Sequence, residues 1–122
     1  MHKFSKPFVE KYTLAERFRE CNNIIKKYPD KIPIICEKNI RDKATIDIDK
    51  HKFLVSRDIN IGQFVYVIRT RLRFPPSAAL FLFVGDYYTI LPNSTPIIDA
   101  YDQFKNSDGF LYLTYSKENV FG

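Results

Sequence analysis

The histidines and aspartates of this chain lack the spacing that catalysis requires. The two histidines are His2, at the N-terminus, and His51, in a charged segment, and neither belongs to an HExxH motif. The sequence holds no GxSxG, P-loop or GxGxxG motif. Asp47 and Asp49 could form an acid–base or metal-binding pair, but lysines follow them closely. That pattern is more typical of a solvated turn.

The two cysteines are better suited to packing than to nucleophilic chemistry. Cys36 ends an apolar segment and Cys21 lies among apolar residues at helical spacing, where thiols usually act as small buried hydrophobic groups. Cys36 and His51 could be paired as nucleophile and base, but no motif supports this. Without a CxxC pattern or a disulfide framework, we expect a reducing, cytosolic compartment. We therefore predict no catalytic residue, no metal, no cofactor and no enzymatic activity.

The C-terminal residue, Gly122, has the most distinctive chemistry. It follows Val120 and Phe121 in what we expect to be an exposed tail. Glycine has no Cβ, so a flexible tail that ends in it can enter a narrow active site. Its carboxylate can then be adenylated, passed to a cysteine and attacked by an amine. A terminal glycine alone is weak evidence, but it gains weight on a suitable fold.

The length and composition indicate one globular domain. The chain has 122 residues, of which 45% are hydrophobic and 27% charged. Its longest apolar run, Ala78 to Val84, is far shorter than the ~20 residues that span a bilayer. The N-terminus lacks the apolar region of a secretory signal. We therefore expect neither a transmembrane helix nor secretion.

The positive charge is concentrated in the first half of the chain. Residues 1–60 hold 14 Lys and Arg against 9 Asp and Glu, whereas residues 61–122 hold five of each. This bias indicates an acidic partner: an acidic peptide, an anionic membrane or a nucleic acid. No RNP-like strand or helix-turn-helix pattern is present, and Arg69, Arg71 and Arg73 also suit a helix C-terminus. No nucleic-acid partner is therefore expected.

The first half of the chain is predicted to form one main helix and two strands. Thr13 and Glu16 form a capping-box pattern for a helix that Pro29 ends after Tyr28, with Leu14, Phe18, Cys21, Ile24 and Ile25 at helical spacing. A shorter helix is predicted within Phe4–Lys11. Lys31–Cys36 and Lys52–Ser56 read as strands, the second at a sheet edge. Pro33 should face a side without ladder hydrogen bonds.

The second half is predicted to form a crossover helix and two further strands. Asn60 and Gln63 open a helix whose apolar stripe is Ile61, Phe64, Val65, Ile68 and Leu72. Ala79–Val84 is predicted to be a fully buried central strand. A short helix over about Thr95–Lys105 and a strand over Phe110–Tyr115 follow.

This order predicts an α+β fold, a ubiquitin-like β-grasp with a mixed four-stranded sheet and a packed helix. The first and last strands should be parallel neighbours, because crossovers are right-handed. We expect an N-terminal helical extension over residues 1–28, the β-grasp domain over 29–116 and a flexible conjugation tail over 117–122.

Several segments make the chain resemble the autophagy-related ubiquitin-like modifiers, the autophagy-related protein 8 and GABARAP family. They are KKYPDKIPIICEK (26–38), DKHKFLV (49–55), IGQFVYVIR (61–69), ALFLFV (79–84), DGFLYLTYS (108–116) and ENVFG (118–122). They occur in family order and cover the chain from about Phe8 to its end.

The resemblance implies a modifier that is joined through Gly122 to phosphatidylethanolamine. Where a precursor extension exists, a cysteine protease would expose the glycine, and it would later release the protein. Activating and conjugating enzymes would carry the protein as thioesters. The protein would be cytoplasmic, and bound to autophagosome or related vesicle membranes when lipidated. There it would recruit receptors whose motif is an aromatic residue, two spacers and an aliphatic residue, with acidic neighbours.

The resemblance also assigns a peptide groove with two pockets beside an edge strand. The aromatic pocket would consist of Glu20, Ile24, Pro33, Ile35, Lys52, Leu54 and Phe110. The aliphatic pocket would consist of Phe53, Val55, Ser56, Ile59, Phe64 and Val67. The cations for the acidic flanks would be Lys31, Lys50 and Arg71. Many of these apolar residues would equally serve as core, and the lysines might only solubilise an edge strand.

Some residues depart from the family pattern. Ser56 stands where proline is usual, Phe53 where tyrosine is common and His51 where a basic residue is usual. The segment 85–96 departs most. The alternatives are a β-grasp adaptor that binds peptides without being conjugated, and a basic domain that binds nucleic acid or anionic lipid directly.

Overall fold

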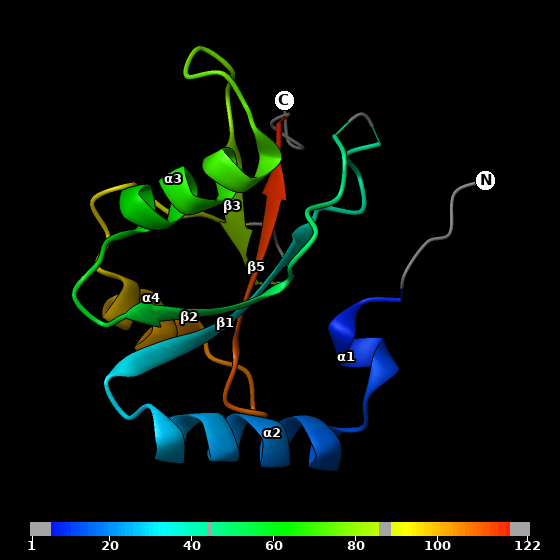
Figure 1. The fold of residues 1–122 in the computed structure, drawn as a ribbon, viewed down its shortest axis with the longest axis vertical. Coiled ribbons are helices and arrows are strands. Elements are labelled where there is room, and N and C mark those ends of the chain that lie inside the picture. Colours follow the sequence, from blue (N-terminus) through cyan, green and yellow to red (C-terminus); the bar gives the residue numbers. More distant parts are fainter. Residues whose placement is uncertain (1–5, 44, 86–88, 118–122) are drawn as a thin grey trace.

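A five-stranded sheet forms the centre of the computed structural model, which describes residues 6–43, 45–85 and 89–117 (Figure 1). The strands are β1 (Lys31–Lys38), β2 (Lys52–Ser56), β3 (Phe81–Val84), β4 (Thr89–Ile90) and β5 (Leu111–Ser116). The helices are α1 (Phe8–Lys11), α2 (Leu14–Lys27), α3 (Ile61–Leu72) and α4 (Ile97–Phe104).

The strand order is β2-β1-β5-β3-β4, which places β2 at one edge. β1 is antiparallel to β2 and parallel to β5, so the predicted parallel neighbours are confirmed. The predicted number of four strands is wrong, because β4 pairs with Phe83 and Val84 of β3. β4 has only two residues and lies in a polar, proline-bearing segment, so no alternation pattern could reveal it.

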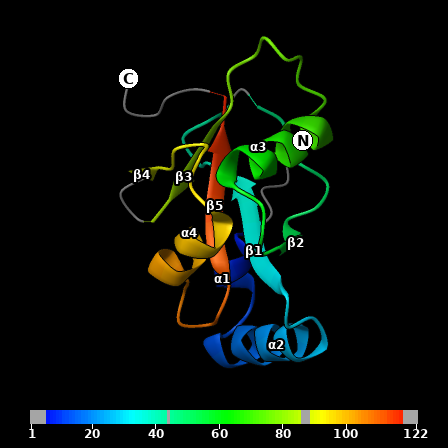
Figure 2. The ribbon, with the colours of Figure 1, turned by 90° about the vertical axis from the view of Figure 1, so that its left-hand side faces the viewer.

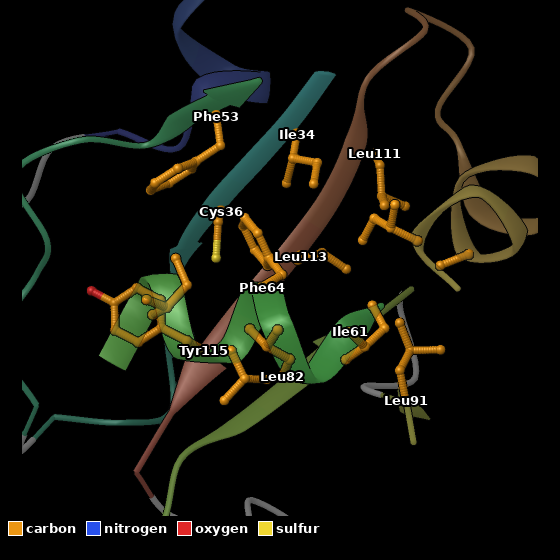
Figure 3. Packing of buried hydrophobic residues seen from close by; sticks show 14 of the residues in the cluster. Ile34, Cys36, Phe53, Ile61, Phe64, Leu82, Leu91, Leu111, Leu113 and Tyr115 are labelled. Carbon is orange, nitrogen blue, oxygen red and sulfur yellow. The ribbon is translucent and has the colours of Figure 1, made fainter. Parts of the chain in front are cut away.

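Helices cover both faces of the sheet (Figure 2). α3 and α4 contribute to the larger cluster, in which Ile32, Ile34 and Cys36 of β1 are buried. The N-terminal helices contribute Phe8 and Cys21 to a smaller cluster on the other face, where Ile35 is buried. β1 therefore alternates between two covered faces, as its sequence predicts. Figure 3 shows the larger cluster, with Phe64 of α3 reaching toward the sheet.

Two capping boxes begin the long helices where the sequence places them. The side-chain oxygen of Thr13 accepts a hydrogen bond from the Glu16 N–H, and the Glu16 carboxylate accepts one from the Thr13 N–H. Asn60 and Gln63 form the same reciprocal pair at the start of α3. These bonds satisfy N–H groups that have no partner within the helix, so both boundaries are set by local sequence.

One expectation about burial is wrong. The predicted fully buried strand over Ala79–Val84 begins only at Phe81, and Ala79 is exposed while Phe81 is half-buried. In α2, Leu14 and Phe18 keep 50% and 49% of their surface exposed, although they share the helical spacing of buried Cys21. Leu14 is the first residue of the helix, and Phe18 lies about 60° around the helix axis from Cys21. Among the described residues, no helix is both long and apolar enough to cross a bilayer.

Candidate functional site

The candidate site follows the free edge of the sheet along β2. Along this strand, Phe53 belongs to the larger cluster on the α3 face, and Val55 packs against it. Lys52 and Leu54 alternate with them and lie on the face that α2 covers. A segment that paired with β2 would therefore meet different residues on its two sides.

On the α2 face, β1 and the residue before β5 supply a buried apolar floor. Ile35 and Phe110 are 0% and 1% exposed, and Pro33 is buried as well. Pro33 pairs with Leu54, and Ile35 with Lys52, so the floor adjoins the edge strand directly. Ile24 of α2 is half-buried against this cluster. The structure thus brings the residues assigned to the aromatic pocket together between α2 and β2.

An ion pair lies above this floor. The ammonium of Lys52 contacts the carboxylate of Glu20 in α2, and the two side chains keep 51% and 35% of their surface exposed. The Lys52 Nζ also lies 5.7 Å from the centre of the Phe8 ring. The pair joins β2 to α2, so an acidic group that approaches here must compete with Glu20 for the lysine.

Phe8 of α1 is a residue of this pocket that the sequence analysis missed. Its ring packs edge-on against Phe110, with 5.5 Å between the ring centres. Its N–H donates a hydrogen bond to the Glu37 carboxylate at 3.0 Å. A phenylalanine at the first position of a four-residue helix gives no periodic signal, so only the tertiary structure reveals its position.

On the α3 face, five of the six residues assigned to the aliphatic pocket also gather. The sixth, Ser56, alternates with Val55 along β2 and lies on the face of Lys52 and Leu54. Phe53 and Phe64 are 6% and 0% exposed and pack edge-to-face, with ring centres 5.5 Å apart. The two rings form the floor of this pocket, and Figure 3 shows both among the buried core residues. Val55, Ile59 and Val67 are half-buried and pack against this floor. These three side chains have apolar surface left to offer a ligand.

Two of the three assigned cations lie on the ring of Phe53. Lys50 Nζ and Arg71 Cζ are 5.3 Å and 5.7 Å from its centre, within the range of cation–π attraction. Arg71 also pairs with Asp49 at 3.3 Å. Lys31, the third cation, pairs with Ser56 in the register at the far end of β2. Positive charge therefore lies near both ends of the edge strand.

An open hollow of about 480 Å³ adjoins the α3 side of the site. Asp49, Tyr66, Val67, Thr70, Arg71 and Arg73 line it. Tyr66, which the sequence analysis missed, is 69% exposed on α3. The sequence places Tyr66 outside the apolar stripe of α3. It does not show that Tyr66 lies beside Val67 and Arg71 in a hollow next to the groove.

Gly122 lies outside the residues that the structure describes. The strand that precedes it ends at Ser116, and both Ser116 and Lys117 are held by the buried carboxylate of Asp42. Asp42 Oδ2 accepts a hydrogen bond from the Ser116 hydroxyl at 3.0 Å and from the Lys117 N–H at 2.9 Å. The chain is thus anchored up to residue 117.

Cys21 and Cys36 are buried, and His51 is paired with an aspartate. Burial raises the pKa of the Cys21 thiol to about 11, and it raises the pKa of Cys36 further. Both thiols are therefore protonated at neutral pH and poor nucleophiles. His51 Nε2 lies 3.2 Å from Asp47 Oδ1 beside the start of β2. Within the described part of the chain, no three His, Cys, Asp or Glu residues are grouped to hold a metal ion.

The comparisons with known proteins agree on one family. Residues 16–122 match the family model described as "Autophagy protein Atg8 ubiquitin like". Autophagy-related protein 8i of Arabidopsis thaliana is 45% identical over 118 residues, which are 96% of this chain and 99% of that protein. Autophagy-related protein 8 of Schizosaccharomyces pombe is 46% identical over 117 residues, covering 94% of this chain and 93% of its own.

A solved structure is also similar throughout. The crystal structure of Trypanosoma brucei ATG8 aligns with a TM-score of 0.84 at 38% sequence identity. The alignment covers 93% of this chain and 95% of that one. Sequence and fold therefore point to the same group of proteins.

Proposed function

Since the chain belongs to the Atg8 family of ubiquitin-like autophagy proteins, we propose that it is a modifier conjugated through Gly122 to phosphatidylethanolamine. In this role the protein recruits receptors to the membrane through the groove along β2. Activating and conjugating enzymes of the lipidation system and a processing and delipidating cysteine protease are its other partners. It works in the cytoplasm and, once lipidated, on autophagosome or related vesicle membranes.

The observation that carries the receptor-binding part is the free edge of β2 with apolar residues on both of its faces. In an extended peptide, successive side chains point to opposite faces, so anchors three positions apart lie on opposite sides. One anchor then reaches the floor of Ile35 and Phe110, and the other reaches Val55, Ile59 and Val67. An aromatic-x-x-aliphatic motif has this spacing.

The charges around the groove favour peptides with acidic flanks. Lys31, Lys50, Lys52 and Arg71 surround the edge strand, and charge complementarity of this kind speeds association and fixes register. Lys52 and Arg71 are each paired with an acidic residue of the protein. Acidic residues of a peptide would replace those partners rather than meet bare charges.

We assign a separate role to each of three segments of the chain. Residues 1–28 act as a helical extension that completes the aromatic pocket, residues 29–116 form the ubiquitin-like domain, and residues 117–122 form the conjugation tail. Glycine at the end of that tail gives the carboxylate access to the activating enzyme with little steric hindrance.

Reconstitution tests the conjugation. The protein is incubated with activating and conjugating enzymes of the family, ATP and phosphatidylethanolamine liposomes, and the product is weighed by mass spectrometry. We expect a lipid adduct with the wild type and none with Gly122→Ala. If active enzymes form neither thioester nor adduct, the modifier function is wrong. The protein would then be an unconjugated peptide-binding adaptor, provided that motif peptides still bind the groove.

A further inference from the structure

The hydrogen-bonding pattern between β1 and β2 determines which residues of β2 are available to a ligand. The N–H of Cys36 donates to the carbonyl of His51 at 2.8 Å, so these two residues form a hydrogen-bonded pair. The neighbouring pair in the register is Ile35 and Lys52. In an antiparallel pair, bonded and non-bonded residue pairs alternate. Continuing along the register, Phe53 and Val55 direct their N–H and C=O groups toward β1.

The alternate residues Lys52 and Leu54 therefore direct both groups to the free edge, and Ser56 directs its N–H there. At the last of these positions, Ser56 pairs in register with Lys31, whose N–H donates instead to the Tyr28 carbonyl at 3.1 Å. This bond agrees with a non-bonded Lys31–Ser56 pair. The edge thus offers three outward N–H groups, those of Lys52, Leu54 and Ser56. A proline at position 56 would have no N–H, so the third donor exists only because this residue is not proline.

We propose that the Ser56 N–H is a peptide-binding donor that extends the pairing of a bound receptor segment beyond Leu54. It donates to a carbonyl of the peptide two residues from the carbonyl that the Leu54 N–H binds, because outward positions recur every second residue. The proposal rests on the peptide-binding function of the groove. The occupant is an extended, acidic-flanked peptide, for which Lys31 lies across from Ser56.

The side chain of Ser56 has a separate task. Its hydroxyl accepts a hydrogen bond from the Asp58 N–H at 3.2 Å, and its carbonyl accepts a long one from the Ile59 N–H at 3.5 Å. These bonds shape the turn that leads from β2 toward α3. The backbone donor and the hydroxyl can therefore be tested with different substitutions.

Two variants separate the donor from the hydroxyl. Ser56→Pro removes the N–H, whereas Ser56→Ala keeps the N–H and removes only the hydroxyl. One net hydrogen bond corresponds to about a 3- to 10-fold change in Kd. We expect Ser56→Pro to weaken binding of an acidic aromatic-x-x-aliphatic peptide by about this factor. Ser56→Ala keeps the donor and should weaken binding less than Ser56→Pro does, and thermal melting checks that both variants fold.

An ester scan of the peptide locates the acceptor. Replacing one backbone amide by an ester weakens the carbonyl as an acceptor, while the N–H lost from the same peptide unit points away from β2. At one position the ester should weaken binding to the wild type but have no further effect on binding to Ser56→Pro. This loss of additivity is the signature of a direct contact.

A measurement on the unmodified protein covers the case in which Ser56→Pro does not fold. Amide hydrogen exchange by NMR reports the Ser56 N–H with and without peptide, and the proposal expects slower exchange when the peptide is bound. Unchanged exchange, equal affinities of the Pro and Ala variants, or ester effects that are additive everywhere would each overturn the proposal. If the wild type binds no motif peptide, the groove function itself fails, which is a different result.

Discussion

Arg17 of α2 donates a hydrogen bond from Nη1 to Oδ2 of Asp108 at 2.6 Å, across 91 residues of sequence. The two side chains are 10% and 0% exposed. Tyr112 donates its hydroxyl hydrogen to the same oxygen at 2.5 Å, and the Phe110 N–H donates to Oδ1 at 2.8 Å. The carboxylate thus joins the N-terminal extension to the start of β5, next to the floor of the aromatic pocket.

Removing one member of this pair should destabilise the fold strongly. Arg17→Ala leaves the buried Asp108 carboxylate without its cation, and breaking a buried ion pair in this way costs about 3 kcal/mol or more. Urea unfolding measures the loss. The matched control is Arg19→Ala on the exposed side of α2, which should change the free energy of unfolding by less than about 0.5 kcal/mol. Equal losses in the two variants would contradict the role of the pair.

The stability of the protein should fall at alkaline pH. Burial raises the pKa of Cys21 to about 11 from its ordinary value near 9. Between these values the unfolded chain releases the proton while the folded one keeps it, so the free energy of unfolding decreases as pH rises. The stabilisation is fully present below pH 9 and is lost as pH approaches 11. Burial also raises the pKa values of Tyr112 and Tyr115, which adds to the loss.

Cys21→Ala isolates the part that this thiol contributes. The variant should be less stable at every pH, since Cys21 is 1% exposed and packs in the smaller cluster. Its stability should nevertheless fall less steeply than that of the wild type from pH 8 to 11, measured by denaturant unfolding. Parallel curves would show that the thiol does not control the alkaline loss.

The Glu20–Lys52 pair should restrain the binding of acidic peptides. Glu20→Gln removes the competing carboxylate and leaves the Lys52 ammonium to the peptide. Because exposed ion pairs are worth about 1 kcal/mol or less, we expect a gain of roughly two- to fivefold in affinity at low salt. Isothermal titration at 50 and 500 mM salt tests this, and screening should remove the gain at the higher concentration.

A peptide with neutral flanks and the same anchors serves as the control for this gain. It should bind Glu20→Gln and the wild type equally well. If the neutral peptide gains as much as the acidic one, Glu20 acts by blocking the pocket rather than by holding the charge of Lys52.

Features encoded by neighbouring residues were predictable from the sequence. The capping boxes at Thr13 and Asn60 involve residues three positions apart, and the two-faced pattern of β1 is visible in successive residues. The buried stripe of α3 also agrees with the prediction. The edge position of β2 followed from these elements, because the fold order leaves it at the rim.

Features that depend on distant partners were not predictable. The Arg17 charge is buried only because Asp108 reaches it, and nothing near either residue signals the other. Phe8 enters the aromatic pocket because the N-terminal helices fold back over the sheet. Leu14 and Phe18 have the spacing of core residues, but both side chains are about half exposed. In each case the tertiary arrangement overrides the local pattern.

The carboxylate of Asp42 should control how firmly the end of β5 is held. Besides Ser116 and Lys117, it accepts hydrogen bonds from Thr45, from the N–H at 2.9 Å and from the hydroxyl at 2.5 Å. Asp42→Ala leaves these buried donors without this acceptor, and the expected cost is about 1 to 3 kcal/mol in the free energy of unfolding. Lys43→Ala, on an exposed neighbour, should have little effect.

The loss of protection from amide exchange in Asp42→Ala should be confined to the end of β5. In Asp42→Ala, the Lys117 N–H should exchange with solvent far faster than the N–H groups in the middle of β5, because only the former loses its acceptor. Groove peptides should bind as before, since Phe53 and Leu54 lie outside the Asp42 contacts. Conjugation through Gly122 should slow if the activating enzyme needs the tail to leave the domain in a fixed direction. Unchanged exchange at Lys117 would show that pairing with β1 and β3 alone holds the strand end.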